Sequence, residues 1–135
     1  MTSVLPLIGR VLLSIMFIMS GLQKLGGAEG TIGYIASAGI PLPQVAYAGT
    51  VALELGGGIL LLIGLFTRPV AALFALFCIA AGLIFHFQPE DQMQMISLFK
   101  NVTIAGGMLF VVAFGPGSIS VDARRGAGLG QPKLA

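Results

Sequence analysis

The sequence has few of the residues from which soluble catalytic and metal sites are usually built. Its 135 residues include no tryptophan, one cysteine and one histidine, and only 9% are charged, against about 25% in an ordinary soluble domain. A single cysteine cannot close a disulfide within the chain, and one cysteine with one histidine cannot complete a zinc site or hold a haem between two histidines. We therefore expect no cofactor held within the chain.

The overall composition indicates a membrane protein and argues against nucleic acid as a partner. The formal net charge is only +2, and the basic residues are dispersed along the chain, whereas nucleic-acid-binding proteins gather Lys and Arg into a patch that neutralises phosphates. Apolar residues make up 56% of the sequence. We therefore expect the lipid bilayer to be the main partner of this chain.

Apolar runs long enough to cross a membrane occur four times. A spanning helix needs about 20 mainly apolar residues, and the four segments that approach this length are 4–22, 45–66, 69–87 and 95–114. They predict an all-α fold, an integral membrane four-helix bundle formed by residues 1–122. The remaining stretch, 123–135, is rich in Gly, Arg and Lys and is predicted to be a flexible cytoplasmic tail. Thr31–Ala38, between the first two spans, is short and amphipathic and predicts an interfacial helix.

The second span contains an acidic residue, Glu54, near its middle. A charge at that depth costs roughly 2.5 to 3.5 kcal/mol on insertion scales, so the carboxyl group must be paired, protonated or in contact with water. Gly56–Gly58 follow directly and carry no side chains, which predicts close approach of a neighbouring helix. Counting helical rise leaves two partners open for Glu54, namely Arg10 of the first span and Lys100 of the fourth.

Polar residues from all four spans are predicted to converge on the outer half of the bundle. The candidate ligand-binding residues are Glu54, Lys24, His86, Lys100, Asn101 and Arg10. A structural interpretation stands beside this one, because an ion pair at Glu54 can simply fix the register of two helices. In that interpretation Lys24 extends to lipid headgroups and His86 is solvated at the interface.

The distribution of Lys and Arg predicts the orientation. Four spans place both termini and the turn at 67–69 on one side, which holds Arg68, Arg124, Arg125 and Lys133, with Arg10 nearest to it. The other side has Lys24 and Lys100. Because cytoplasmic loops are enriched in basic residues, both termini are predicted to be cytoplasmic.

Four blocks of the chain resemble the DoxX family of small four-span membrane proteins. The blocks are GRVLLSIMFIMSGLQKL at 9–25, YIASAGIPLP at 34–43, LELGGGILLLIGLFTR at 53–68 and LFKNVTIAGG at 98–107. The resemblance extends from about Val4 to Asp122 and implies a four-helix bundle in the bacterial plasma membrane. By motif position it implies a polar set made of Arg10, Lys24, Glu54, Arg68, Lys100 and Asn101.

The resemblance also implies a hypothesis about function. The family is named for its similarity to a subunit of a thiosulfate:quinone oxidoreductase, and other members are linked to oxidative-stress complexes or labelled quinol oxidase subunits. This chain would then be a membrane-embedded subunit of a quinone-linked redox system that binds a quinone or lipid-like molecule in the outer half. Lys24 or His86 would hydrogen-bond a quinone oxygen, Glu54 would relay a proton, and electrons would come from a redox partner subunit.

The alternative hypothesis belongs to a different class. Here the chain is a non-enzymatic membrane anchor or assembly protein, in which the ion pair at Glu54 is structural and protein partners, including further copies in a homo-oligomer, are held by the helices. The two hypotheses make different demands on Glu54, since only the first requires this residue to contact a ligand.

Overall fold

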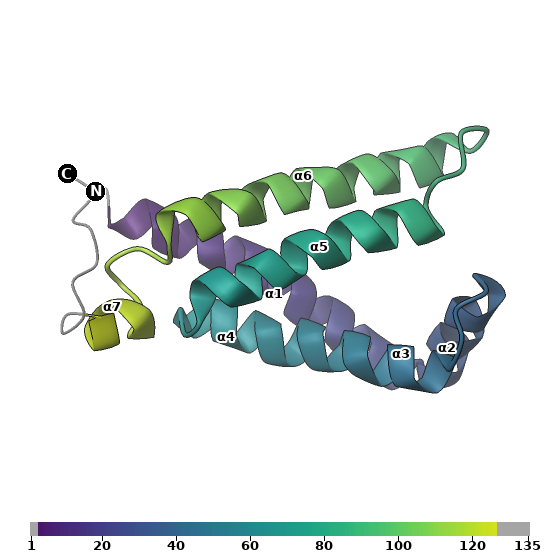
Figure 1. The fold of residues 1–135 in the computed structure, drawn as a ribbon, viewed down its shortest axis with the longest axis horizontal. Coiled ribbons are helices and arrows are strands. Elements are labelled where there is room, and N and C mark those ends of the chain that lie inside the picture. The colour runs from purple at the N-terminus through teal and green to yellow at the C-terminus, as the bar shows by residue number, and fades with distance from the viewer. Residues whose placement is uncertain (1–2, 127–135) are drawn as a thin grey trace.

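The computed structural model describes residues 3–126, and every regular element in that range is a helix (Figure 1). Four segments have the length and apolar composition of membrane spans: α1 (Val4–Gly26), α3 to α4 (Pro43–Ile63), α5 (Thr67–Phe85) and α6 (Gln92–Phe114). The predicted all-α, four-span fold is confirmed. The apolar side chains on the outside of these four spans require the lipid bilayer as their surroundings.

Two short helices complete the described part of the chain. Helix α2 (Ala28–Ser37) lies between the first two spans, where the sequence predicted a short helix. Helix α7 (Val121–Gly126) follows the fourth span. Residues 123–126, which were predicted to begin a flexible tail, are therefore helical. The rest of that predicted tail, 127–135, lies outside the described residues.

The second span is built from three consecutive helical pieces. Helix α3 (Pro43–Val51) continues into η1 (Ala52–Gly57), and η1 continues into α4 (Gly58–Ile63). The middle piece, η1, is a π-helix, whose i to i+5 hydrogen bonds accommodate one extra residue in a turn. The sequence analysis did not predict this wider turn, which contains Glu54.

Capping residues, prolines and glycines set the ends of the spans. The observed ends differ from the predicted ones by up to four residues. Pro43 is at the start of α3, where its missing N–H is not needed. The carboxylate of Asp91 caps α6 by accepting from the backbone N–H groups of Met93 (3.0 Å) and Gln94 (3.2 Å), so this helix begins before the predicted residue 95. Gly64 ends α4 with a positive φ of 73°.

The bundle consists of two helix hairpins. Helix α1 packs against the second span, and α5 packs along the length of α6. The hairpins meet at the end where α1 begins and α7 lies, which we call the terminal end, and they diverge toward the end that carries α2, which we call the α2 end (Figure 1). Stacked rings of Phe17 and Phe74, with centroids 3.9 Å apart, join the two hairpins within the core.

Two of the three consecutive glycines allow neighbouring helices to approach closely, Gly57 between the two hairpins and Gly58 between α1 and the second span. A Cβ at Gly57 would lie 3.0 Å from the Phe74 ring, and a Cβ at Gly58 would lie 2.8 Å from Ile18. A Cβ at Gly56 would have no neighbour within 4 Å. The predicted close helix contact is thus confirmed for Gly57 and Gly58, and this contact stands between the packed core and the divergent α2 end.

Candidate functional site

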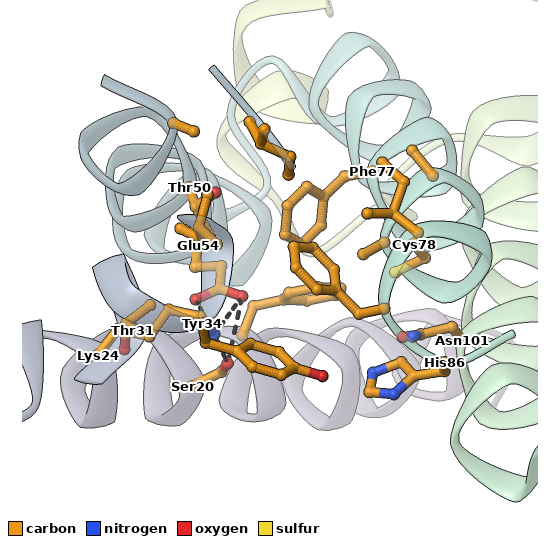
Figure 2. A pocket seen from close by; sticks show the side chains of 18 of the residues that line it. Ser20, Lys24, Thr31, Tyr34, Thr50, Glu54, Phe77, Cys78, His86 and Asn101 are labelled. Carbon is orange, nitrogen blue, oxygen red and sulfur yellow. Dashed lines mark hydrogen bonds and ion pairs between the residues drawn. The ribbon is translucent and has the colours of Figure 1, made fainter. Parts of the chain in front are cut away.

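A pocket of about 440 Å³ lies between the diverging hairpins (Figure 2). Most of its lining is apolar or aromatic, and the polar side chains lie on two walls. The labelled polar and aromatic members are Ser20, Lys24, Thr31, Tyr34, Thr50, Glu54, Phe77, His86 and Asn101. An apolar cavity with a few convergent polar groups is the usual form of a small-molecule site.

Glu54 forms an ion pair with Lys24 in the first polar wall (Figure 2). The Lys24 Nζ lies 3.0 Å from each carboxylate oxygen and donates hydrogen bonds to Oε1 and to the Ser20 hydroxyl (2.7 Å). Ser20 in turn donates to Oε1 at 3.2 Å. Oε2 is shielded and accepts no hydrogen bond from the described residues. Lys24 therefore faces both oxygens of the carboxylate, and Oε2 is in ion-pair contact with Nζ without an aligned hydrogen bond.

Burial differs sharply between the two partners of this pair. The Glu54 side chain is 4% exposed, whereas that of Lys24 is 27% exposed. Burying a carboxylate is favourable only when a cation and further hydrogen bonds compensate for the lost hydration. Lys24 and Ser20 provide this compensation, and Lys24 remains accessible from the pocket.

The predicted partners of Glu54, Arg10 and Lys100, were wrong. Lys24 takes that role, so it does not extend to lipid headgroups as the structural interpretation proposed. Helical rise gives the depth of each residue correctly but not the direction in which its side chain points. Lys24 and Ser20 are four residues apart on α1 and therefore share a face, and this face meets η1.

The π-helix η1 is the element that presents Glu54 to α1. Glu54 is the third residue of η1, and α1 contacts this segment. A π turn changes the direction of the side chains within it relative to a continuous α-helix, and such turns are frequent at functional sites. The register of this one segment thus places the carboxylate against Lys24 and into the pocket wall.

The second polar wall comes from the other hairpin. His86 follows the end of α5 and its Nδ1 lies 2.8 Å from the Gln94 Oε1, while Asn101 of α6 lines the pocket nearby (Figure 2). Within residues 3–126 no hydrogen bond engages the Asn101 side-chain amide. Its donor and acceptor are therefore free to bind a ligand in the pocket.

The two other predicted site residues are not in the pocket. Lys100 is exposed on the surface of α6, on a different face from Asn101. Arg10 lies toward the terminal end, where it is 2% exposed and its Nη2 donates to the Ile119 carbonyl at 2.9 Å. Four of the six predicted residues, Glu54, Lys24, His86 and Asn101, thus line one cavity.

The terminal end is held by contacts between α7 and the turn that joins α4 to α5. The Asp122 carboxylate accepts from the backbone N–H groups of Phe66 (2.9 Å) and Thr67 (2.8 Å), and the Asp122 N–H donates to the Gly64 carbonyl (2.8 Å). Partial burial opposes ionisation of Asp122, but these N–H groups and Arg125 outweigh it and lower its pKa. Asp122 is therefore an acidic cap at the start of α5.

Sequence analysis missed three contributions to the site. Ser20 completes the ion-pair network, and its spacing of four residues from Lys24 was an available signal. Tyr34 of α2 stacks on Phe85 of α5, with centroids 5.1 Å apart, at the edge of the pocket. Cys78 is buried and also forms part of the wall. No sequence signal identified the last two contacts, since both depend on how the hairpins diverge.

Comparisons with known proteins find one membrane-protein family and relatives named as inner membrane proteins. The family model described as DoxX matches residues 5–87. Inner membrane protein YphA of Escherichia coli (strain K12) is 40% identical over 126 residues, which cover 90% of each chain. Inner membrane protein YqjF of the same organism is 36% identical over 119 residues, 86% of this chain and 88% of that protein.

A third relative carries a name that refers to an activity. The protein named "Putative oxidoreductase CatD" of Bacillus subtilis (strain 168) is 47% identical over 72 residues, which cover 53% of this chain and 52% of that protein. No solved structure matches the chain significantly.

Proposed function

Because this chain belongs to the DoxX family of membrane proteins, we propose that its pocket binds the headgroup of a membrane quinone and that the chain serves as the membrane subunit of a quinone-linked redox system. The observation that carries this proposal is the position of Glu54. Its carboxylate is buried in the pocket wall, and the Lys24 Nζ, which also lines the pocket, lies 3.0 Å from both carboxylate oxygens.

The chemistry of this wall suits both redox states of a quinone. An oxidised quinone carries carbonyl oxygens, which accept hydrogen bonds, and a quinol carries hydroxyl groups, which donate them. The Lys24 ammonium is a donor, and the Glu54 carboxylate is an acceptor, side by side. A site with both functions can hold the ligand before and after it gains two protons and two electrons.

The second wall provides a partner for the far side of the ring. A para-quinone has oxygens at opposite ends of a flat ring, and Asn101 and His86 lie on the hairpin that faces the Lys24–Glu54 pair (Figure 2). The volume of about 440 Å³ is within the range of roughly 300–1,000 Å³ typical of ligand pockets. Aromatic side chains such as Phe77 supply flat apolar surface between the two walls.

The proposal includes an orientation and a source of electrons. With both termini in the cytoplasm, as the distribution of basic residues favours, the pocket lies in the outer half of the bacterial plasma membrane. Two electrons for each quinone reduced come from a redox partner protein, and the protons come from the Glu54 side of the pocket. The name of the relative CatD supports the assignment to redox chemistry.

The anchor hypothesis retains support from one observation. The side chains of Lys24, Ser20 and Glu54 already hydrogen-bond to one another. Such a network is expected where an ion pair fixes two helices in register. In this hypothesis the pocket holds no quinone, and the chain assembles a partner through its helices. Extraction of bound molecules distinguishes the two hypotheses.

The test is the content of bound small molecules after purification in mild detergent. Wild type is expected to retain a quinone, detected by mass spectrometry of the extract, and Glu54→Gln is expected to lose it. Lys100→Ala is the matched control, because it removes a charge from an exposed position outside the pocket. Thermal melting of each variant shows that the fold is intact. Absence of quinone from wild type, or equal retention by Glu54→Gln, contradicts the proposal.

A further inference from the structure

One side of the pocket is closed by α2. Tyr34 of α2 stacks on Phe85 of α5, with an interplanar angle of 25° and a centroid distance of 5.1 Å. Ile35 of the same helix is 5% exposed and lines the pocket from this side. Helix α2 thus lines the pocket at the α2 end, and the Tyr34–Phe85 stack links it to α5.

A second side of the pocket, between α3 and α5, lacks such a closure. Ala80 and Ile84 of α5 line the pocket and are also exposed on the surface of the bundle. The α3 wall contributes Ala46 and Thr50. Alanine ends at Cβ, so two of these four side chains cannot reach across the space between the helices.

This opening lies at a depth where lipid tails surround the protein. Helix α5 contacts η1 and α4 toward the terminal end, and the hairpins diverge from there toward α2 (Figure 1). Ala80 is five residues before Phe85, the last residue of α5, which corresponds to about 7.5 Å of helical rise. The opening between α3 and α5 is therefore within the span and faces the acyl chains.

We propose that the gap between α3 and α5 is a lateral portal, through which the hydrophobic tail of the bound quinone extends into the bilayer while its ring contacts Glu54. This inference rests on the proposed function and adds a ligand class to it, a quinone with a long apolar tail. The ligand enters from the membrane rather than past α2. A tail that stays in the bilayer retains its apolar surroundings, so only the ring needs space in the pocket.

The test compares a tailed quinone with a ring that has no tail. Purified protein in phospholipid vesicles is titrated with a long-chain prenylquinone or with duroquinone, a tetramethyl ring. Ala80→Trp places a large side chain in the portal, and Leu76→Trp is the matched control, since Leu76 is 70% exposed on the same helix and does not line the pocket. Ala80→Trp is expected to weaken binding of the prenylquinone by about tenfold and that of duroquinone by less than about twofold.

The outcomes separate the portal from the function on which it rests. Selective loss of the prenylquinone in Ala80→Trp, with Leu76→Trp like wild type and all melting curves unchanged, supports the portal. Equal affinities in Ala80→Trp and wild type overturn the portal and leave the quinone site standing, as does an equal loss of both ligands. Wild type that binds neither compound overturns the proposed function and the portal together.

Discussion

The two ends of the bundle each bury one charged side chain, but in different surroundings. Glu54, 3% exposed, borders a pocket at the α2 end, and its partner Lys24 is accessible. Arg10, 2% exposed, is enclosed at the terminal end and donates to a backbone carbonyl, that of Ile119. Sequence alone presents both as isolated charges within apolar spans. We infer that a buried charge is a candidate for a ligand site only where a cavity adjoins it.

The described residues around Arg10 are closely packed. A Cβ at Gly64 would collide with the Arg10 guanidinium and would come within 2.5 Å of Ser120. The Nε and Nη1 atoms of Arg10 have no hydrogen-bond partner among the described residues. Burial removes the hydration of this charge, and the nearby carboxylate of Asp122 and the Ile119 carbonyl offset that loss in part. We interpret Arg10 as a structural residue.

The largest expected effect is therefore that of Arg10→Ala. Removing this enclosed side chain leaves a cavity and the Ile119 carbonyl without its donor, and we expect a loss of about 3 kcal/mol in the free energy of unfolding. Thermal melting in detergent measures it, with Lys100→Ala as the exposed control. If Arg10→Ala melts at the same temperature as wild type, the contacts of the Arg10 side chain do not stabilise the terminal end.

Gly57→Val is expected to have the next largest effect, because Gly57 lies where the packed core meets the divergent end. The added side chain would contact the Phe74 ring, which stacks on Phe17, and overpacking of this kind costs about 2 kcal/mol. Gly56→Val is a closely matched control, since a Cβ there has open space. Equal melting temperatures of the two variants would show that the hairpins can separate at this contact without cost.

Glu54→Gln is expected to lower stability by only about 1 kcal/mol, although it is also expected to abolish the proposed quinone binding. The pocket already adjoins Glu54, so the change creates no new cavity, and Lys24 keeps Ser20 as a partner and remains partly accessible. A double-mutant cycle with Lys24→Met measures the coupling of the pair. A destabilisation as large as that of Arg10→Ala would assign Glu54 a mainly structural role.

The smallest expected effect is the pH dependence of stability that Asp122 causes at the terminal end. The pKa of Asp122 is lowered in the folded chain, so its contribution is present above its unfolded pKa of about 3.9 and is lost as pH falls through the folded pKa. Asp122→Asn should cost up to about 1 kcal/mol at pH 7, and this cost should shrink as pH falls below about 3.9. Melting temperatures of the two proteins across this range measure the effect. A difference that persists undiminished at low pH contradicts the role of the carboxylate charge, which faces Arg10 and Arg125.

The sequence predicted the spans well because their physical cause is local. Runs of apolar residues, Pro43 and Gly64 act within a few residues of their own positions, so the number of spans and their approximate ends follow directly. Four residues of the pocket were also predicted, since residues at the same depth in a small bundle must lie near one another.

The pairing of Glu54 could not be predicted in the same way. Counting helical rise left Arg10 and Lys100 as partners and did not select Lys24, because the pairing also depends on the direction in which each side chain points around its helix. The π turn at Ala52–Gly57 changes that direction within the span that carries Glu54. The contact of Asp122 with Phe66 and Thr67 likewise joins residues more than fifty positions apart, without a sequence pattern to indicate it.

The cap that α7 places on α5 affects how reporter proteins should be attached to this molecule. A fusion that replaces the chain from Asp122 onward would leave the amide groups of Phe66 and Thr67 without their carboxylate acceptor. A reporter joined after Gly126 keeps the whole of α7. Alkaline phosphatase or fluorescent-protein fusions meant to locate the carboxyl terminus should therefore be joined beyond Gly126, so that the tag reports on the native arrangement.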